Sequence, residues 1–244
     1  MASVHTMSYE DRLDTWKDRW NRGAIGWHQS DINFALQNHS SKLLTKPKCR
    51  VLVPLCGKTV DLEWLYREGH TVVGIDGVEQ GIIEFFSEHN LPHITEKLSW
   101  GKVFKTEDEK LKIYCCDIFK MDVQSLGKFD AVWDRGSLVA IYEEDRERYA
   151  DLIKGLLAPE FCYLVNIIQY TPKGTFRGPP RNVPTKLVQE LFGKKRRHNT
   201  ITTAKWEGEA VDEWLKCRHD IQEDPGSRPT LHHKLGFFSH PLVA

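Results

Sequence analysis

The stretch "RVLVPLCGKTVDLEWL" (residues 50–65) sets a short apolar run before a single glycine and an amphipathic segment. The run 50–55 predicts a buried strand, and the apolar positions after it recur at helical spacing on one face: Val60, Leu62, Trp64 and Leu65. A strand that enters a helix through a tight glycine turn is typical of nucleotide-binding α/β units. The ligand that the turn at Gly57 was shaped to hold therefore decides the function.

Strand-like and helix-like segments alternate from residue 50 onward. We expect further strands at 70–76, 111–119, 129–136 and 161–170, and helices at 78–90, 143–159 and 184–193. The first of these helices should turn Ile82, Ile83, Phe85 and Phe86 inward, and Pro159 should end the second. Residues 198–206 and 231–239 could add two more strands. The alternation predicts a doubly wound α/β fold with a mostly parallel sheet and no internal repeat.

Composition narrows the function class. The chain has 244 residues, of which 40% are hydrophobic and 28% charged, and its 34 basic residues balance 34 acidic ones. This balance argues against nucleic acid as a partner, and we interpret the basic run "KKRRH" (194–198) as a solvated helix end. No apolar run is long enough to span a membrane, and the first residues lack the apolar segment of a secretory signal.

The six cysteines include no C-x-x-C pair, and several lie in apolar runs such as "KIYCCDIF" (112–119). This usage argues against a zinc site or a disulfide framework and favours a reducing compartment, so we expect a cytoplasmic protein that needs no metal. No long exposed apolar face is evident, and we expect a monomer.

Three ligands could occupy the glycine turn. A triphosphate needs G-x-x-x-x-G-K-[ST], but Leu52 stands where the first glycine should be. A nicotinamide dinucleotide needs the three glycines of G-x-G-x-x-G, and "PLCGKTVD" (54–61) has one. A nucleoside cofactor without phosphates needs a single glycine. Carboxylates follow the next two strands: Asp76 could accept hydrogen bonds from ribose hydroxyls, and Asp117 from an adenine amine, with the backbone N–H of Ile118 reaching the ring. This set describes an S-adenosylmethionine site, although both aspartates could simply begin turns.

A set of motifs makes the sequence resemble a known family. In order they are "PLCGK" (54–58), "GKFD-x-x-WDRG" (127–136), "GPP-x-x-VP" (178–184) and "LFG" (191–193). Over residues 12–193 the chain resembles the thiopurine S-methyltransferases, which are class I methyltransferases. The resemblance implies a single domain, with a helical cap over 1–45 and an α/β core with a seven-stranded sheet over 46–244. It also implies S-adenosyl-L-methionine as cofactor, S-adenosyl-L-homocysteine as product, and a small thiol as substrate.

The resemblance also implies roles for individual residues. The cofactor-binding set is Trp16, Trp20, Trp27, Leu55, Gly57, Asp76, Asp117, Ile118 and Arg135. The substrate-binding set is Trp27, Arg135, Pro179 and Pro180, and the catalytic set is Arg135 and Asp134. The chain departs from the family at Arg181 and Asn182, where relatives carry an aromatic residue. Arg218 is the candidate for a further substrate arginine.

Other interpretations stay open. Trp16 and Trp20 lie four residues apart and could be a docking stripe, His28 could be structural, and Asp134 could cap a turn. A methyltransferase acting on halide, hydrosulfide or another small thiol is the enzymatic alternative. A catalytically idle protein that binds S-adenosylmethionine is the alternative of another class.

Overall fold

The computed structural model describes residues 9–171, 178–193 and 199–206. The chain divides into two compact units, one formed by residues 1–33 and 47–127 and the other by 34–46 and 128–244. Each unit combines helices with a β-sheet, so the fold is mixed α/β, as the alternating pattern predicted. The described residues contain no helix that is long and apolar enough to cross a membrane.

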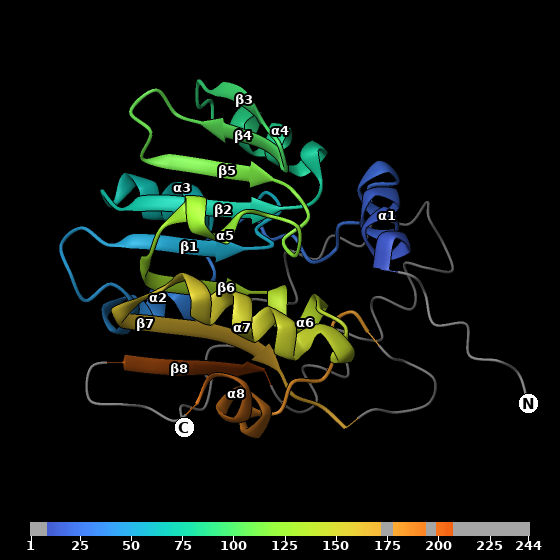
Figure 1. Ribbon diagram of the computed structural model, residues 1–244, viewed down its shortest axis with the longest axis vertical. Helices are drawn as coiled ribbons and strands as arrows, with labels where there is room; N and C mark the ends of the chain where they lie inside the picture. The colour runs from blue at the N-terminus through green and yellow to red at the C-terminus, as the bar shows by residue number, and fades with distance from the viewer. Residues whose placement is uncertain (1–8, 172–177, 194–198, 207–244) are drawn as a thin grey trace, which may run out of the picture. The chain divides into compact units, whose positions relative to one another are not determined.

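The first unit carries five strands in the order β3-β4-β5-β2-β1 (Figure 1). They are β1 (Arg50–Pro54), β2 (Thr71–Asp76), β3 (Ile94–Leu98), β4 (Gly101–Lys105) and β5 (Leu111–Cys115). Strand β2 pairs in parallel with both β1 and β5, whereas β4 pairs antiparallel with β3 and β5. The helices of this unit are α1 (Tyr9–Asn21), α3 (Asp61–Arg67), α4 (Glu79–Glu88) and α5 (Val123–Leu126).

Apolar residues of the parallel strands and the two connecting helices form the core of this unit. Leu62 and Leu65 of α3 are fully buried, and so are Ile82 and Phe85 of α4. Ile83 was expected to turn inward with them, but it is 49% exposed, so that prediction is wrong. The helical period explains the difference, since a residue beside Ile82 is rotated by about 100° away from the buried stripe.

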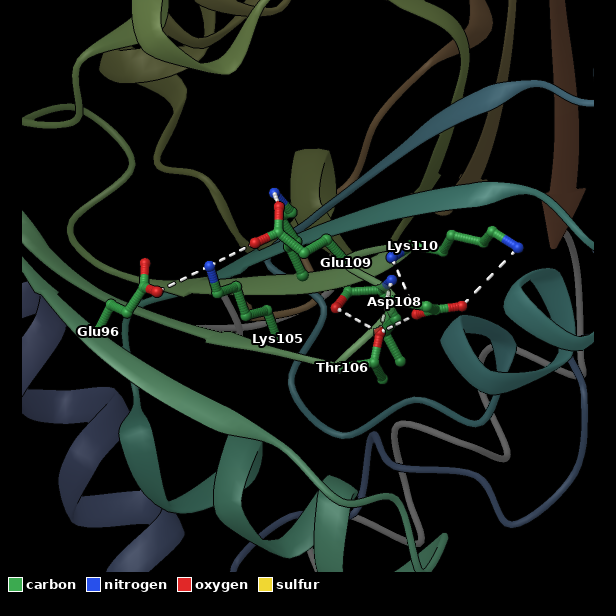
Figure 2. A network of polar contacts seen from close by, with 8 residues as sticks. Glu96, Lys105, Thr106, Asp108, Glu109 and Lys110 are labelled. Atoms are coloured by element: carbon green, nitrogen blue, oxygen red, sulfur yellow. Dashed lines mark hydrogen bonds and ion pairs between the residues drawn. The ribbon is translucent and has the colours of Figure 1, made fainter.

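The antiparallel strands β3 and β4 were not foreseen. Strand β3 is almost entirely exposed, and its residues "ITEKL" lack the apolar alternation that marks a half-buried strand. A polar network stabilises this edge (Figure 2). Lys105 Nζ lies 2.7 Å from a Glu96 oxygen and 2.6 Å from a Glu109 oxygen, and Thr106 donates its hydroxyl to Asp108 at 2.6 Å. The hydrogen bonds from Lys105 and Lys112 lower the pKa of Glu109 to about 2.

The second unit carries three parallel strands in the order β6-β7-β8. They are β6 (Phe129–Arg135), β7 (Leu157–Ile168) and β8 (Asn199–Trp206), the last confirming the strand expected at 198–206. The helices are α2 (Phe34–Leu43), α6 (Ser137–Ala140), the 3₁₀ turn η1 (Glu143–Asp145), α7 (Arg146–Leu156) and α8 (Thr185–Phe192). Helix α2 packs against β6 and β7, and α7 against α8.

The helix predicted over 143–159 begins and ends differently. A 3₁₀ turn precedes it, and α7 ends at Leu156. Pro159 lies inside β7, at the place where the pairing with β6 skips from Phe129 to Ala131. A proline fits there because a bulged segment needs no ladder hydrogen bond from its nitrogen. Six of the seven expected strands are present in the described residues, and the hairpin of β3 and β4, which was not expected, brings the number there to eight. The possible strand at 231–239 lies outside the described residues.

Candidate functional site

The strands β1, β2 and β5 run in parallel, so their carboxyl ends meet at one edge of the first unit. In open α/β sheets this is the edge that binds ligands. The chain leaves β1 through Leu55, whose φ of +43° lies in the left-handed region that side chains avoid, and through Gly57, with a φ of +52°. A leucine held in this conformation indicates that the turn is shaped by its surroundings rather than by local preference.

Asp76 ends β2 and ties the turn to it. The backbone N–H of Gly57 donates to Asp76 Oδ2 at 2.7 Å, and that of Val78 donates to Oδ1 at 2.9 Å. Burial raises the pKa of Asp76, while these backbone donors and that of Gly77 oppose the rise. A carboxylate has about four lone-pair positions, so these backbone donors leave acceptor capacity for at least one ribose hydroxyl. The residue therefore fits the role that the resemblance implies.

Asp117 and Ile118 follow the neighbouring strand at the same edge. Strand β5 pairs with β2 so that Asp76 lies opposite Cys115, and Cys116 N–H donates to the Asp76 carbonyl at 2.9 Å. Asp117 Oδ1 accepts from the Phe119 N–H at 3.0 Å, as in a turn-initiating aspartate. The structure therefore brings the two acidic residues to one edge.

Lys58, which follows the turn, is engaged by helix α4. Its side chain is buried, and Nζ lies 2.8 Å from a Glu84 oxygen and 2.6 Å from a Glu88 oxygen. In a phosphate-binding loop this lysine would have to face the phosphates. Leu52, at the position of the missing glycine, is fully buried in β1. The sequence analysis did not predict the ion pairs of Lys58 with Glu84 and Glu88. Two glutamates four residues apart on one helix face were the available signal.

Helix α1 lies on the glycine turn. The Trp20 side chain is 3% exposed, and a Cβ added at Gly57 would stand 3.3 Å from its ring, while one added at Gly81 would stand 2.7 Å away. Trp27 packs edge-on against Trp16 and Trp20, with ring centroids 5.2 Å and 6.0 Å apart. The three tryptophans named from the sequence therefore form one aromatic cluster beside the turn.

Asp134 is the penultimate residue of β6, in the second unit. It is fully buried and accepts hydrogen bonds from the hydroxyls of Tyr149 and Tyr163, both at 2.6 Å, and from the Leu138 N–H at 3.3 Å. Burial raises the pKa of Asp134 against these donors. Arg135, half-buried, is the last residue of the strand. Sequence reasoning missed both tyrosines, because neither lies near Asp134 in the chain.

Pro179 and Pro180 belong to a loop that is fastened to the same unit. The Tyr170 hydroxyl donates to the Pro180 carbonyl at 2.9 Å, and the Arg181 N–H donates to the Val139 carbonyl at 2.8 Å. The loop is therefore held on the segment that follows β6. Arg218 and the run 194–198 lie outside the described residues. Within the part of the chain that the structure describes, no group of three His, Cys, Asp or Glu residues could hold a metal.

Comparison with known proteins identifies the family. The family profile of thiopurine S-methyltransferase matches residues 11–214. The chain belongs to this family. The thiopurine S-methyltransferase of Mus spretus is 43% identical over 75% of this chain and 78% of its own length. That of Rattus norvegicus is 42% identical over the same shares of the two chains. The probable thiopurine S-methyltransferase of Danio rerio is 40% identical over 74% of this chain and 79% of its own.

Solved structures support the fold assignment of this thiopurine S-methyltransferase family member. Phosphoethanolamine N-methyltransferase 2 of Haemonchus contortus, in complex with S-adenosyl-L-methionine, matches 91% of this chain with a TM-score of 0.56 and 15% identity. The match spans about half of that enzyme chain, 51%. At this identity the likeness concerns the fold alone, and it agrees with the class I methyltransferase architecture expected from the sequence.

Proposed function

We propose that the protein is an S-adenosylmethionine-dependent S-methyltransferase of the thiopurine type, which methylates small aromatic or heterocyclic thiols. Family membership supports the reaction. The assignment of the cofactor rests on one observation: the glycine turn, Asp76 and Asp117 lie at the same carboxyl edge of β1, β2 and β5. The single glycine and the engaged Lys58 suit a ligand without phosphates better than a nucleotide.

In this proposal each residue at the edge binds one part of the cofactor. Asp76 accepts from the ribose hydroxyls, and Asp117 with the Ile118 N–H binds the adenine. Leu55 and Gly57 give the amino-acid portion a close approach to backbone. The tryptophans 16, 20 and 27 exclude water, and Trp27 also borders the acceptor. The proposal rests on Asp76 keeping free acceptor positions after bonding Gly57 and Val78.

Methyl transfer to a thiolate requires little general acid–base catalysis from the protein. Bound S-adenosylmethionine supplies a methyl group activated by its sulfonium. Heteroaromatic thiols ionise near neutral pH, so the residues mainly hold the thiolate in line, which can be worth up to about 7–11 kcal/mol. Arg135, a permanent cation, stabilises the anionic acceptor, and Pro179 and Pro180 line its pocket. Asp134 holds the turn that carries Arg135, through its bonds to Tyr149 and Tyr163.

A methyl-transfer assay with S-adenosylmethionine tests the proposal. We expect mass spectrometry to detect S-methylated 6-mercaptopurine, and to detect little methyl iodide when iodide replaces the thiol. Turnover of iodide or hydrosulfide alone would favour the enzymatic alternative. Tight S-adenosylhomocysteine binding with no turnover of any acceptor would favour a catalytically idle binding protein.

A pH–rate profile tests the absence of a general base. We expect His28→Ala to keep the profile of the unaltered enzyme within a few-fold. Arg135→Lys should lower the rate while leaving the shape of the profile, because lysine keeps the charge and loses the planar fork. Loss of several orders of magnitude in His28→Ala, together with loss of a titration near pH 6–7, would identify His28 as the base.

We further propose that the chain is a single methyltransferase domain, with residues 1–45 as cap and 46–244 as core, and that it is a cytoplasmic monomer. Each of the two compact units takes segments from two separate parts of the chain, which supports a single domain. Urea unfolding followed by tryptophan fluorescence and circular dichroism should give one coincident transition. Light scattering should give the monomer mass, and fractionation of cells should recover the protein in the cytosol.

A further inference from the structure

Two arginines in the second unit are buried, and neither forms an ion pair with another residue that the structure describes. Arg146 is 6% exposed and Arg181 is 7% exposed. Among the described residues neither guanidinium pairs with a carboxylate: Arg146 Nη2 donates to the Asn182 carbonyl at 3.1 Å, and Arg181 Nη1 donates to the Ala140 carbonyl at 2.7 Å. Arg146 Nε has no acceptor at all within that part of the chain.

The two guanidinium groups share one locality. Asn182, which accepts from Arg146, is the residue after Arg181, so the two side chains are anchored to the same short loop. Burial lowers the pKa of Arg146, and the charge of Arg181 adds to this effect while exposed Glu143 opposes it. Burying two like charges is costly unless an anion compensates them, and arginine does not lose its proton in proteins.

The surroundings suit a small planar anion. The Arg181 guanidinium lies over the Tyr142 ring, 3.7 Å from its centroid, which fixes its plane and leaves its edge for hydrogen bonds. Guanidinium groups bind carboxylates through two parallel N–H···O bonds. The loop is also pinned to the segment that follows β6 through the bond from Arg181 N–H to Val139. Ligands bind at this end of parallel strands, and β6 ends at Arg135, the proposed acceptor residue.

We propose that Arg146 and Arg181 form a subsite for a carboxylate carried by the methyl acceptor, so that the preferred thiols are aromatic acids. The inference deepens the proposed function and rests on it for the identity of the reaction. It rests on the burial of the two guanidinium groups and on the Arg146 Nε that lacks an acceptor in the described residues.

Steady-state methylation of 4-mercaptobenzoate and of 4-mercaptobenzamide tests the subsite. We expect kcat/KM to be about 10- to 100-fold higher for the acid, the range of a hydrogen-bonded charge. Arg181→Gln should remove that preference through KM and change the amide by less than about threefold. Arg148→Gln, an exposed position on the same helix as Arg146, is the matched control and should keep the preference. Equal rates for acid and amide, or an equal loss of both in Arg181→Gln, would overturn the proposal.

Calorimetry of benzoate and benzamide binding to the protein with S-adenosylhomocysteine distinguishes failure of the subsite from failure of the proposed reaction. If neither these thiols nor 6-mercaptopurine is methylated, the proposed function fails, but benzoate binding that Arg181→Gln weakens would still support the subsite. If the thiols are methylated and benzoate binds no better than benzamide, the subsite is wrong and the reaction stands.

Discussion

At the scale of single residues, Asp76 has both a structural role and a proposed binding role. Its carboxylate is buried, holds Gly57 and Val78 through their N–H groups, and in our account also binds the ribose. Asp76→Asn should weaken S-adenosylhomocysteine binding by about 10- to 100-fold, because an amide offers one acceptor oxygen and no charge. Isothermal titration calorimetry measures the change. Asp130→Asn, which removes the charge from a partner of Lys46 in the second unit, is the control and should bind normally. Unchanged affinity in Asp76→Asn would exclude the ribose role.

Lys58 has a structural role, although the sequence around it resembles the end of a phosphate-binding loop. Lys58→Met should lower the free energy of unfolding by roughly 1 kcal/mol and Tm by about 2–4 °C, because Glu84 and Glu88 lose their buried partner. Burial of Glu84 is outweighed by its hydrogen bond from Lys58, so its pKa is lowered from 4.5. A carboxyl group whose pKa is lower in the folded than in the unfolded protein stabilises the fold at pH values above its unfolded pKa. This contribution is lost as the pH falls through the folded pKa.

The difference in Tm between Lys58→Met and the unaltered protein should therefore be large at neutral pH and shrink as the pH falls below 4.5. Differential scanning calorimetry at several pH values follows it. Lys186→Met, which breaks an exposed pair with Glu190, should shift Tm little at any pH. A difference that grew in acid would contradict the role assigned to the ion pairs.

At the scale of elements, helix α1 packs against α4 through the Trp20 ring. Gly81 lies in α4, where alanine is usually better by about 1 kcal/mol, but a Cβ there would stand 2.7 Å from the Trp20 ring. Gly81→Ala should therefore destabilise the protein by about 1–3 kcal/mol in urea unfolding. In a Trp20→Leu background the same change should become neutral or stabilising. Equal effects in both backgrounds would show that Trp20 does not pack there.

The end of β6 depends on a buried polar group. Tyr163→Phe removes one of the two tyrosine hydroxyls that donate to Asp134, and should cost about 1.5–3 kcal/mol of unfolding free energy. Tyr114→Phe is the control, since the Tyr114 ring stacks on Trp100 and its hydroxyl has no hydrogen bond in the described structure. If both variants unfold at the same urea concentration, the bond to Asp134 contributes nothing to the turn that carries Arg135.

The elements differ in how well the sequence predicts them. Strands β1, β2, β6 and β7 are buried apolar runs, and their existence follows from composition and length alone. The exposed edge strand β3 carries no such signal, and its pairing with β4 depends on long-range contacts such as that between Glu96 and Lys105. Helix α7 ended early because β7 extends through Pro159 at a register shift, which no local pattern reveals.

At the scale of the whole molecule, the site was predictable where chemistry follows topology. The carboxyl ends of parallel strands share an edge, so the sequence alone was enough to group Asp76, Asp117 and Gly57. The partners of other buried polar residues could not be predicted, because they come from distant segments of the chain. Lys58 pairs with α4, Asp134 with Tyr149 and Tyr163, and Arg146 with the loop at Asn182. The anion subsite became visible only from burial and missing ion pairs.

The crystal structure of the protein with S-adenosylhomocysteine is the most direct test of the account. We predict electron density at the carboxyl edge of β1, β2 and β5, with the ribose hydroxyls on Asp76, the adenine beside Asp117 and the Ile118 N–H, and the amino-acid portion over Gly57. Density for the ligand at another place, or a ribose with no contact to Asp76, would contradict the assignment of this edge as the cofactor site.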